Sequence, residues 1–369
     1  MDQHHLGFVH SYRLPKYIRS TTFHEALESN PKLVIEDAVN SRPGFIRYFQ
    51  TFKQVLKIRN QQKTSLWLVN FRGHEIYWPL RWLLGHNSRL IFDELVSPYD
   101  AWVNERAEFN KNSPFARFVY RVEKDILEDA NFLVADSKSQ AAYYADIFQI
   151  PVEKFTVIRL SVNEHIFYPD AEPKKFDYAE PFIVFTYGSF NPLQGMNLLP
   201  TVAEMLKDLP IRFIVAGGRG KRLTRFLQTL KERSITNISH TRWINFKELP
   251  SYMCGAGLCL GGPLGSSAQA CRLITGKALQ ALACASPTVI GLNEETQDLF
   301  TDRVDCLLVK PGDVDSIARA IRWAYDHRDE LPEIGRQGRK TYEKYYSMAI
   351  LRQNLNSFVD SILEEKARS

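Results

Sequence analysis

A cation and an amide interrupt an otherwise small and apolar segment, RLITGKALQALACASPTVIG, at residues 272–291. Lys277 and Gln280 are three positions apart, so they share one face if the segment is a helix. A solvent-facing stripe is the plain explanation, but the surrounding side chains are those of a core. A polar stripe on a buried helix normally faces a partner. We therefore expect Lys277 and Gln280, with Arg272 upstream, to hold a polar ligand.

Three glycine-bearing loops follow apolar, strand-like runs in the C-terminal half. They read TYGSFNPLQG at 186–195, AGGRGKRLTRF at 216–226 and GGPLGSS at 261–267. Glycines allow close backbone approach, and the free N–H groups at the start of a following helix suit a phosphate. Taken alone, the first loop is better explained as an ordinary strand-to-helix connection.

The second loop places cations where a helix is expected to begin. Arg219 and Lys221 there oppose the helix macrodipole, which favours negative charge at an N-terminus. A bound anion would neutralise this repulsion between the cations and the helix N-terminus, whereas on a solvated basic face the repulsion would remain. Both explanations remain open at this point.

Polar residues also follow two strand-like runs of the N-terminal half, in FRGHE at 71–75 and FDELVSPYD at 92–100. His74, Asp93, Glu94 and Asp100 are thus expected at strand ends. Carboxylates in such places bind sugar hydroxyls, although Asp100 could simply cap the helical run that follows it.

The sequence gives no indication of a metal site. Asp313 and Asp315 form a DxD pair, but they follow Pro311-Gly312 and open a helix, so we interpret them as caps. The five cysteines form no CxxC pair and have no histidine at ligand spacing, and we interpret them as reduced and mostly buried. We found no His, Cys and carboxylate cluster, and we expect no metal and no cofactor other than a substrate.

Strand-like and helix-like patterns alternate along the chain, which predicts an α/β protein with two doubly wound, Rossmann-like parallel sheets. Residues 169–181, PDAEPKKFDYAEP, are the expected linker between residues 1–168 and 182–346. Residues 347–369 are expected to form a helix that crosses back to the N-terminal domain. Expected strands lie at 5–10, 33–36, 65–69, 89–95, 131–137, 154–160, 182–188, 211–218, 237–241, 257–261, 287–291 and 306–310.

The 369-residue chain is mildly basic, with a formal net charge of +5. This is too little to indicate nucleic-acid binding and fits contact with phosphates or an anionic membrane surface. MDQHHLGF lacks the features of a signal peptide, and no long apolar run could span a membrane. We expect a cytoplasmic protein, with peripheral contact at the inner face of a membrane as a further expectation.

Together these segments resemble retaining glycosyltransferases of the GT-B fold, in family 4 of that enzyme class. The C-terminal half is similar to the family in YGSFNPLQGMNLL, IRFIVAGGRG, KALQALACASPTVIG (the family's EALACGxPVV) and PGDVDSIARAIRWAYD. The N-terminal half is similar in DANFLVADSKSQAAYY and KFTVIRLSVNEHIFYP. The resemblance implies a nucleotide-sugar donor, a UDP- or GDP-sugar, on the C-terminal domain. It also implies an acceptor on the N-terminal domain and transfer with retention and without a catalytic metal.

Several family positions carry other residues here. The Arg and Lys of the first C-domain loop fall on Ser189 and Gln194, and the two glutamates eight positions apart fall on Arg272 and Gln280. The histidine that often follows the N-domain strand falls on Leu95. Some branches carry Lys-x-x-Gln, to which Lys277 and Gln280 are similar.

The resemblance implies that Lys277 and Arg272 clamp the diphosphate and that Gln280 bonds ribose hydroxyls. Catalytic roles are expected for Arg272, Lys277, Asp93 and His74. Donor contacts are expected from Gly188, Ser189, Gln194, Gly218, Arg219, Lys221, Gly265, Arg272, Lys277 and Gln280.

The expected function is sugar transfer to a glycan, lipid-linked or protein-linked acceptor in the synthesis of a cell-surface glycan or glycoconjugate. A GT-B-like binding or scaffold subunit without catalysis is an alternative, because several family residues are replaced. A sugar-nucleotide epimerase is a weaker alternative, since it would need carboxylates in the C-terminal domain where the glutamates are missing.

Overall fold

The structure is a computed structural model that describes residues 3–14, 16–42, 44–61, 64–105, 108–176 and 181–368. The chain forms two compact units. Residues Met1–Ser161 and Met348–Ser369 make the N-terminal unit, and residues Val162–Ser347 make the C-terminal unit. Among the described residues, no helix is long and apolar enough to cross a lipid bilayer.

The N-terminal unit contains a six-stranded parallel sheet in the order β2-β1-β3-β4-β5-β6. Its strands are β1 (His4–His10), β2 (Leu33–Val39), β3 (Thr64–Val69), β4 (Arg89–Asp93), β5 (Phe132–Ala135) and β6 (Phe155–Val157). Its helices are α1 (Ile18–Glu28), α2 (Ile46–Asn60), α3 (Tyr77–Leu84), α4 (Pro114–Asp129), α5 (Lys138–Phe148) and α13 (Met348–Arg368).

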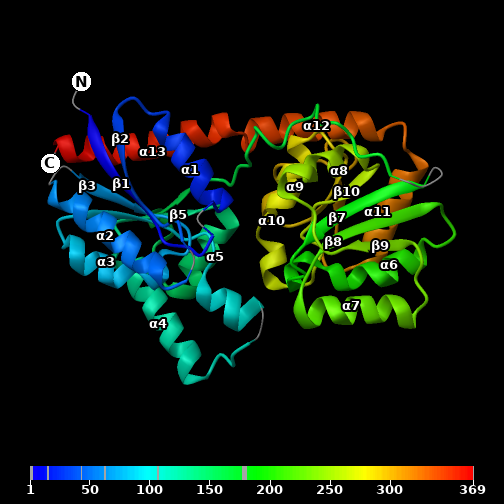
Figure 1. Ribbon diagram of the computed structural model, residues 1–369, viewed down its shortest axis with the longest axis horizontal. Coiled ribbons are helices and arrows are strands. Elements are labelled where there is room, and N and C mark those ends of the chain that lie inside the picture. The colour runs from blue at the N-terminus through cyan, green and yellow to red at the C-terminus, as the bar shows by residue number, and fades with distance from the viewer. Residues whose placement is uncertain are drawn as a thin grey trace. The chain divides into compact units, whose positions relative to one another are not determined.

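Helices cover both faces of this sheet, so the strands are apolar on both sides (Figure 1). In β3, Leu66 and Leu68 pack with α1 and α13, while Trp67 and Val69 point to the opposite face with α2 to α5. Gly7 on β1 makes room for the Trp67 ring, which a Cβ at position 7 would overlap.

The C-terminal unit contains a second six-stranded parallel sheet, in the order β12-β11-β10-β7-β8-β9. Its strands are β7 (Phe182–Gly188), β8 (Ile211–Gly217), β9 (Ile238–Thr241), β10 (Leu258–Leu260), β11 (Thr288–Gly291) and β12 (Leu307–Val309). The strand order reverses between β7 and β10. In open parallel sheets, ligands bind at such a reversal, outside the carboxyl ends of the strands.

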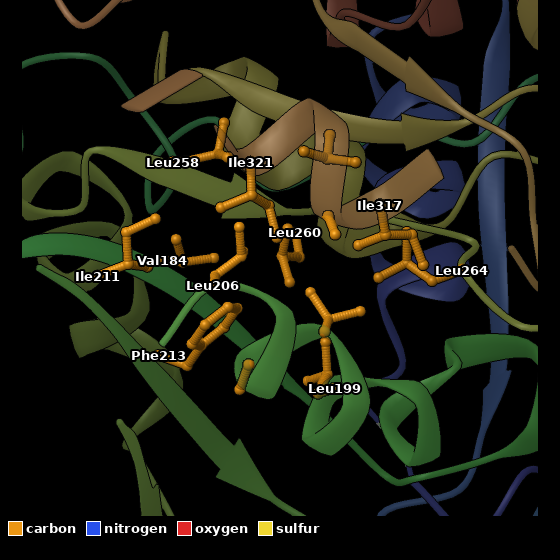
Figure 2. Packing of buried hydrophobic residues seen from close by; sticks show 14 of the residues in the cluster. Val184, Leu199, Leu206, Ile211, Phe213, Leu258, Leu260, Leu264, Ile317 and Ile321 are labelled. Atoms are coloured by element: carbon orange, nitrogen blue, oxygen red, sulfur yellow. The ribbon is translucent and has the colours of Figure 1, made fainter. Parts of the chain in front are cut away.

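One face of this second sheet carries a dense aliphatic core. Figure 2 shows Ile317 and Ile321 of α11 packed with Leu199 of α6 and Leu260 of β10. Helices α8 and α9 pack on β7, β10 and β11. The helices of the unit are α6 (Leu199–Met205), α7 (Gly220–Glu232), α8 (Leu249–Gly255), α9 (Gly276–Ala283), α10 (Glu294–Gln297), α11 (Val314–Asp326) and α12 (Leu331–Tyr345).

The structure differs from the expected organisation in two places. Residues 162–168 lie in the C-terminal unit, and the expected linker at 169–181 packs on that unit where it is described. Lys174 donates its backbone N–H to Ser251 O of α8 at 2.8 Å, and the Phe176 ring contacts Tyr252. The prolines suggested a free linker, but Ala171 and Phe176 supply apolar contacts that hold the segment down.

Residues 100–129 do not form one continuous helix. A short π-helical turn, η2 (Asp100–Glu105), precedes α4, and Ser113 caps α4 by accepting the N–H of Ala116. Pro114 begins α4 because its missing N–H is not needed at the first helical position.

Candidate functional site

Helix α9 directs its polar stripe at the carboxyl end of β7. Lys277 Nζ lies 3.3 Å from Thr186 Oγ1, and the Tyr187 hydroxyl donates to Gln280 Oε1. Both side chains are buried, so the stripe does not face solvent. It lies instead at the point of strand reversal, where a parallel sheet binds its ligand.

Local capping fixes the direction of α9. Thr275 is the N-cap, since its Oγ1 accepts the N–H of Ala278 at 3.2 Å. The same hydroxyl donates to Gly261 O, just after β10, at 2.6 Å. Thr275 thus ties the start of α9 to the end of β10, two residues before Lys277.

The ammonium group of Lys277 is buried among side chains that do not neutralise its charge. Burial lowers the pKa of its ammonium to about 7 because removal from water disfavours the charged form. No described acidic side chain forms an ion pair with it. A diphosphate would supply the missing negative charge.

The first glycine loop folds over the end of β7. Gln194 Oε1 accepts the N–H of Phe190 at 2.8 Å, and its amide covers Gly188, where a Cβ would overlap it. Gly218 of the second loop donates its N–H to Gly188 O at 2.8 Å. Gly265 of the third loop donates to Leu193 O at 3.0 Å. The three loops therefore form one contiguous surface.

The other residues predicted to contact the nucleotide-sugar lie at the edge of this surface or apart from it. Arg219 and Lys221 are exposed, with Arg219 at the N-cap of α7. Ser189 is exposed, and Arg272 is buried in the turn before α9. The contacts described above bring together Gly188, Gln194, Gly218, Gly265, Lys277 and Gln280, and they do not include Ser189, Arg219, Lys221 or Arg272.

Asp93, at the end of β4, is enclosed in an ion pair. Its Oδ1 lies 2.8 Å from Arg19 Nη2, and both side chains are fully buried. Arg19 also donates to Ile158 O at 2.8 Å and stacks over the Phe23 ring. This arrangement ties α1 to β4, and Asp93 has no exposed surface to offer a substrate.

His74 lies in the turn η1 (Gly73–Glu75) after β3 and contacts a second carboxylate. Its Nε2 is 2.8 Å from Glu94 Oε2, and burial lowers the imidazole pKa to about 4. Glu123 of α4 joins this pair, with ligand atoms of the three residues within 4.8 Å of one another. Burial, then the neighbouring Glu94, raises the Glu123 pKa to about 8.

This group corrects the expectation that the chain has no cluster of histidine and carboxylates. Glu123 gave no signal in the sequence because it lies inside an amphipathic helix, where a glutamate normally faces water. In the structure it is 1% exposed. Asp100 also differs from the expected cap: its Oδ1 accepts from Asn104 and from the Tyr143 hydroxyl.

Asp313 occupies the position predicted for it. It is the N-cap of α11, accepting the N–H of Ser316 at 3.0 Å. Four of the five cysteines are partly or fully buried, whereas Cys271 is exposed, and none forms a disulfide.

The two parallel sheets with helices on both faces define a two-domain GT-B fold, as in solved structures that superpose along the whole chain. Sucrose-phosphate synthase from Thermosynechococcus elongatus is 17% identical, with TM-score 0.73 over 98% of this chain and 100% of that one. HepE of Anabaena, in complex with UDP and glucose, is 12% identical, with TM-score 0.72 over 96% and 99%. A glycosyltransferase from Rickettsia africae ESF-5 is 12% identical, with TM-score 0.68 over 98% and 99%.

The sequence comparison with family models also finds a glycosyltransferase-like match. Residues 198–355 match the family model described as glycosyl transferase-like, which covers less than half of the chain. These residues include α9 with Lys277 and Gln280. Comparison with curated protein sequences gives no match.

Proposed function

We propose that the protein is a retaining glycosyltransferase that uses a nucleotide-sugar, a UDP- or GDP-sugar, as donor. The buried cation of Lys277 at the strand reversal carries this proposal. The diphosphate would lie against Lys277 and the glycine loops, with Gln280 and Tyr187 near the ribose. The bond from the anomeric carbon to the diphosphate breaks as an acceptor hydroxyl attacks that carbon from the face that the diphosphate leaves, so the configuration is retained. The hydroxyl proton passes to the departing phosphate oxygen, and Lys277 stabilises the remaining negative charge there.

The position of Lys277 supports the proposal that no metal ion is needed at the diphosphate. A cation held in a desolvated position, with no carboxylate of the described residues beside it, stabilises anionic charge more strongly than one in water. The acceptor would be a glycan, lipid-linked or protein-linked, in the synthesis of a cell-surface glycan or glycoconjugate. HepE, similar in fold, has been solved with UDP-glucose. The catalytic roles of Arg272 and His74 stay predictions, whereas the enclosed Asp93 is better suited to tying α1 to β4.

A nucleotide panel tests the donor site. UDP, GDP, ADP and dTDP are each added to the full chain, and the melting temperature is recorded. A ligand present at 100 times its dissociation constant stabilises the folded state by about 2.7 kcal/mol, so one or two nucleotides are expected to raise the melting temperature clearly. Lys277→Met serves as the control that should respond less. If no nucleotide shifts the wild type, the scaffold alternative is favoured.

Exposed aromatic side chains of the N-terminal unit support the proposal of peripheral contact with a membrane surface. Phe45 and Phe49 at the start of α2 are 82% and 78% exposed, and Trp82 of the neighbouring α3 is 79% exposed. Lys53 and Lys57 continue the same exposed side of α2. Aromatic side chains beside cations are typical of helices that lie at an anionic lipid interface.

We expect the protein to sediment with vesicles that contain anionic lipid and to remain free with neutral vesicles. The double variant Phe45→Ser/Phe49→Ser should lose most of this binding because it removes the apolar contact. Trp243→Ser, at an exposed tryptophan of the C-terminal unit, is the matched control and should bind normally. Binding that is unaffected by the double variant would place the contact elsewhere.

A further inference from the structure

Three side chains from distant parts of the chain meet inside the N-terminal unit. His74 comes from η1, Glu94 follows β4 directly, and Glu123 comes from α4. We name them the His-Glu-Glu cluster. Glu94 and Glu123 are 0% and 1% exposed, whereas the His74 side chain keeps 9% exposure and so reaches the surface.

The His-Glu-Glu cluster has more acceptors than donors. Glu94 Oε2 contacts His74 Nε2, and Glu123 Oε2 accepts the N–H of Tyr99 at 2.9 Å. Glu94 Oε1, Glu123 Oε1 and His74 Nδ1 are buried without a hydrogen-bond partner. Buried polar atoms are nearly always satisfied, so three unsatisfied atoms in one cluster indicate something that the chain itself does not provide.

We propose that the His-Glu-Glu cluster binds one divalent transition-metal ion, with Zn²⁺ the tightest of Mn²⁺, Co²⁺ and Zn²⁺. Two carboxylates and a neutral imidazole carry a charge of −2, which one such ion neutralises. Imidazole nitrogen and carboxylate oxygen are both ligands of Zn²⁺, and three protein ligands leave a position for water. Affinity for a nitrogen and oxygen site rises from Mn²⁺ through Co²⁺ towards Zn²⁺.

The proposal goes beyond sugar transfer and differs from the sequence expectation of no metal. The ion would fasten the turn after β3, the end of β4 and α4 to one another. Its ligands all belong to the N-terminal unit, whereas the proposed diphosphate site is made by residues of the C-terminal unit. The competing explanation is a proton shared between Glu94 and Glu123, which would bond the two carboxyls without a metal.

Metal binding to the full-length protein separates these explanations without any activity assay. After dialysis against a chelator and then against chelator-free buffer, we expect the wild type to bind one equivalent of Zn²⁺ in calorimetry and to melt at a higher temperature with Zn²⁺. Co²⁺ should give the visible absorption of a nitrogen and oxygen site. Glu123→Gln should weaken Zn²⁺ binding by more than about tenfold, because loss of even an outer partner costs that much.

Glu123→Gln is expected to fold. Its amide oxygen can still accept from Tyr99 N, and its NH₂ can donate to Glu94 Oε1. Asp37→Asn is the matched control, because Asp37 contacts His24 Nε2 at 2.7 Å in a partly exposed pair and loses a carboxylate in the same way. It should bind Zn²⁺ as the wild type does. No Zn²⁺ binding by the wild type, or equal binding by Glu123→Gln, would overturn the metal site and leave the shared proton.

Discussion

Replacement of Lys277 by Met is expected to remove most sugar transfer while leaving the fold at least as stable. Lys277 is buried, and removal from water disfavours its charge and lowers its pKa to about 7. Met has a similar length and no charge, so the substitution removes the cost of burying the ammonium. Thr186 Oγ1 loses the hydrogen bond that it accepts from Lys277, but it still donates to Leu260 O. The free energy of unfolding should therefore not fall.

Transfer should fall because the lost cation acts on the leaving diphosphate. Loss of one group that stabilises developing charge costs about 2–4 kcal/mol of activation free energy, or about 30-fold to about 1000-fold in rate. Arg272→Ala is expected to act in the same direction. Lys207→Met makes the same change at an exposed lysine and should alter neither property. Equal loss of stability and activity in Lys277→Met would show that the stripe is structural.

The same lysine predicts a pH dependence. In the folded protein its pKa, about 7, lies below the ordinary lysine value of 10.5, so between these pH values the folded protein holds fewer protons than the unfolded chain. The free energy of unfolding of the free protein should therefore rise through this window. A bound diphosphate favours the ammonium, so nucleotide affinity should fall above pH 7 and binding should take up a proton. Titration calorimetry between pH 7.5 and 9 measures the nucleotide affinity and the proton uptake on binding. Lys277→Met should show neither the fall in affinity nor the proton uptake.

Much of the architecture could be predicted because it depends on local patterns. Each expected strand has its counterpart in the structure, since short β-branched runs between glycine loops allow few alternatives. Helix α1 gave a weaker signal. Arg19, Ser20 and Thr22 are all buried on it, so its inner face does not look apolar.

The polar sites were only partly predictable because their pairs are distant in sequence. Lys277 and Gln280 could be recognised from local contrast with their neighbours. In contrast, Asp93 looked available for substrate, and the partner that encloses it, Arg19, lies 74 positions away. Glu123 and Glu94 likewise come together only through the packing of α4 on the sheet.

Removal of residues 347–369 is expected to unfold the N-terminal unit, because α13 supplies part of its core. Met348, Leu351 and Leu355 are at most 3% exposed, and they pack with α1 and one face of the sheet. Val359, Ile362 and Leu363 continue the same stripe. Each buried side chain of this size contributes about 1.5–3 kcal/mol, so the helix supplies on the order of 10 kcal/mol. That equals the whole stability of a typical domain.

Polar contacts fix the position of this helix along its length. Arg89 Nη1 donates to Ile362 O at 2.9 Å, and Asn30 Nδ2 donates to Asp360 Oδ1 at 3.0 Å. A truncated protein should therefore aggregate rather than shift another segment into place. Size-exclusion chromatography and circular dichroism measure this, and a monomeric, equally stable truncation would contradict it.

A single substitution tests how much the apolar stripe of α13 contributes to stability while the helix stays in place. Leu355 is 0% exposed at the centre of the stripe, so Leu355→Ala should lower the free energy of unfolding by about 2–5 kcal/mol. Asn354→Ala, at the adjacent exposed position, should change it by less than about 0.5 kcal/mol. Urea denaturation measures both values. If the two variants are equally stable, the apolar stripe of α13 contributes little, and the loss expected from truncation has another cause.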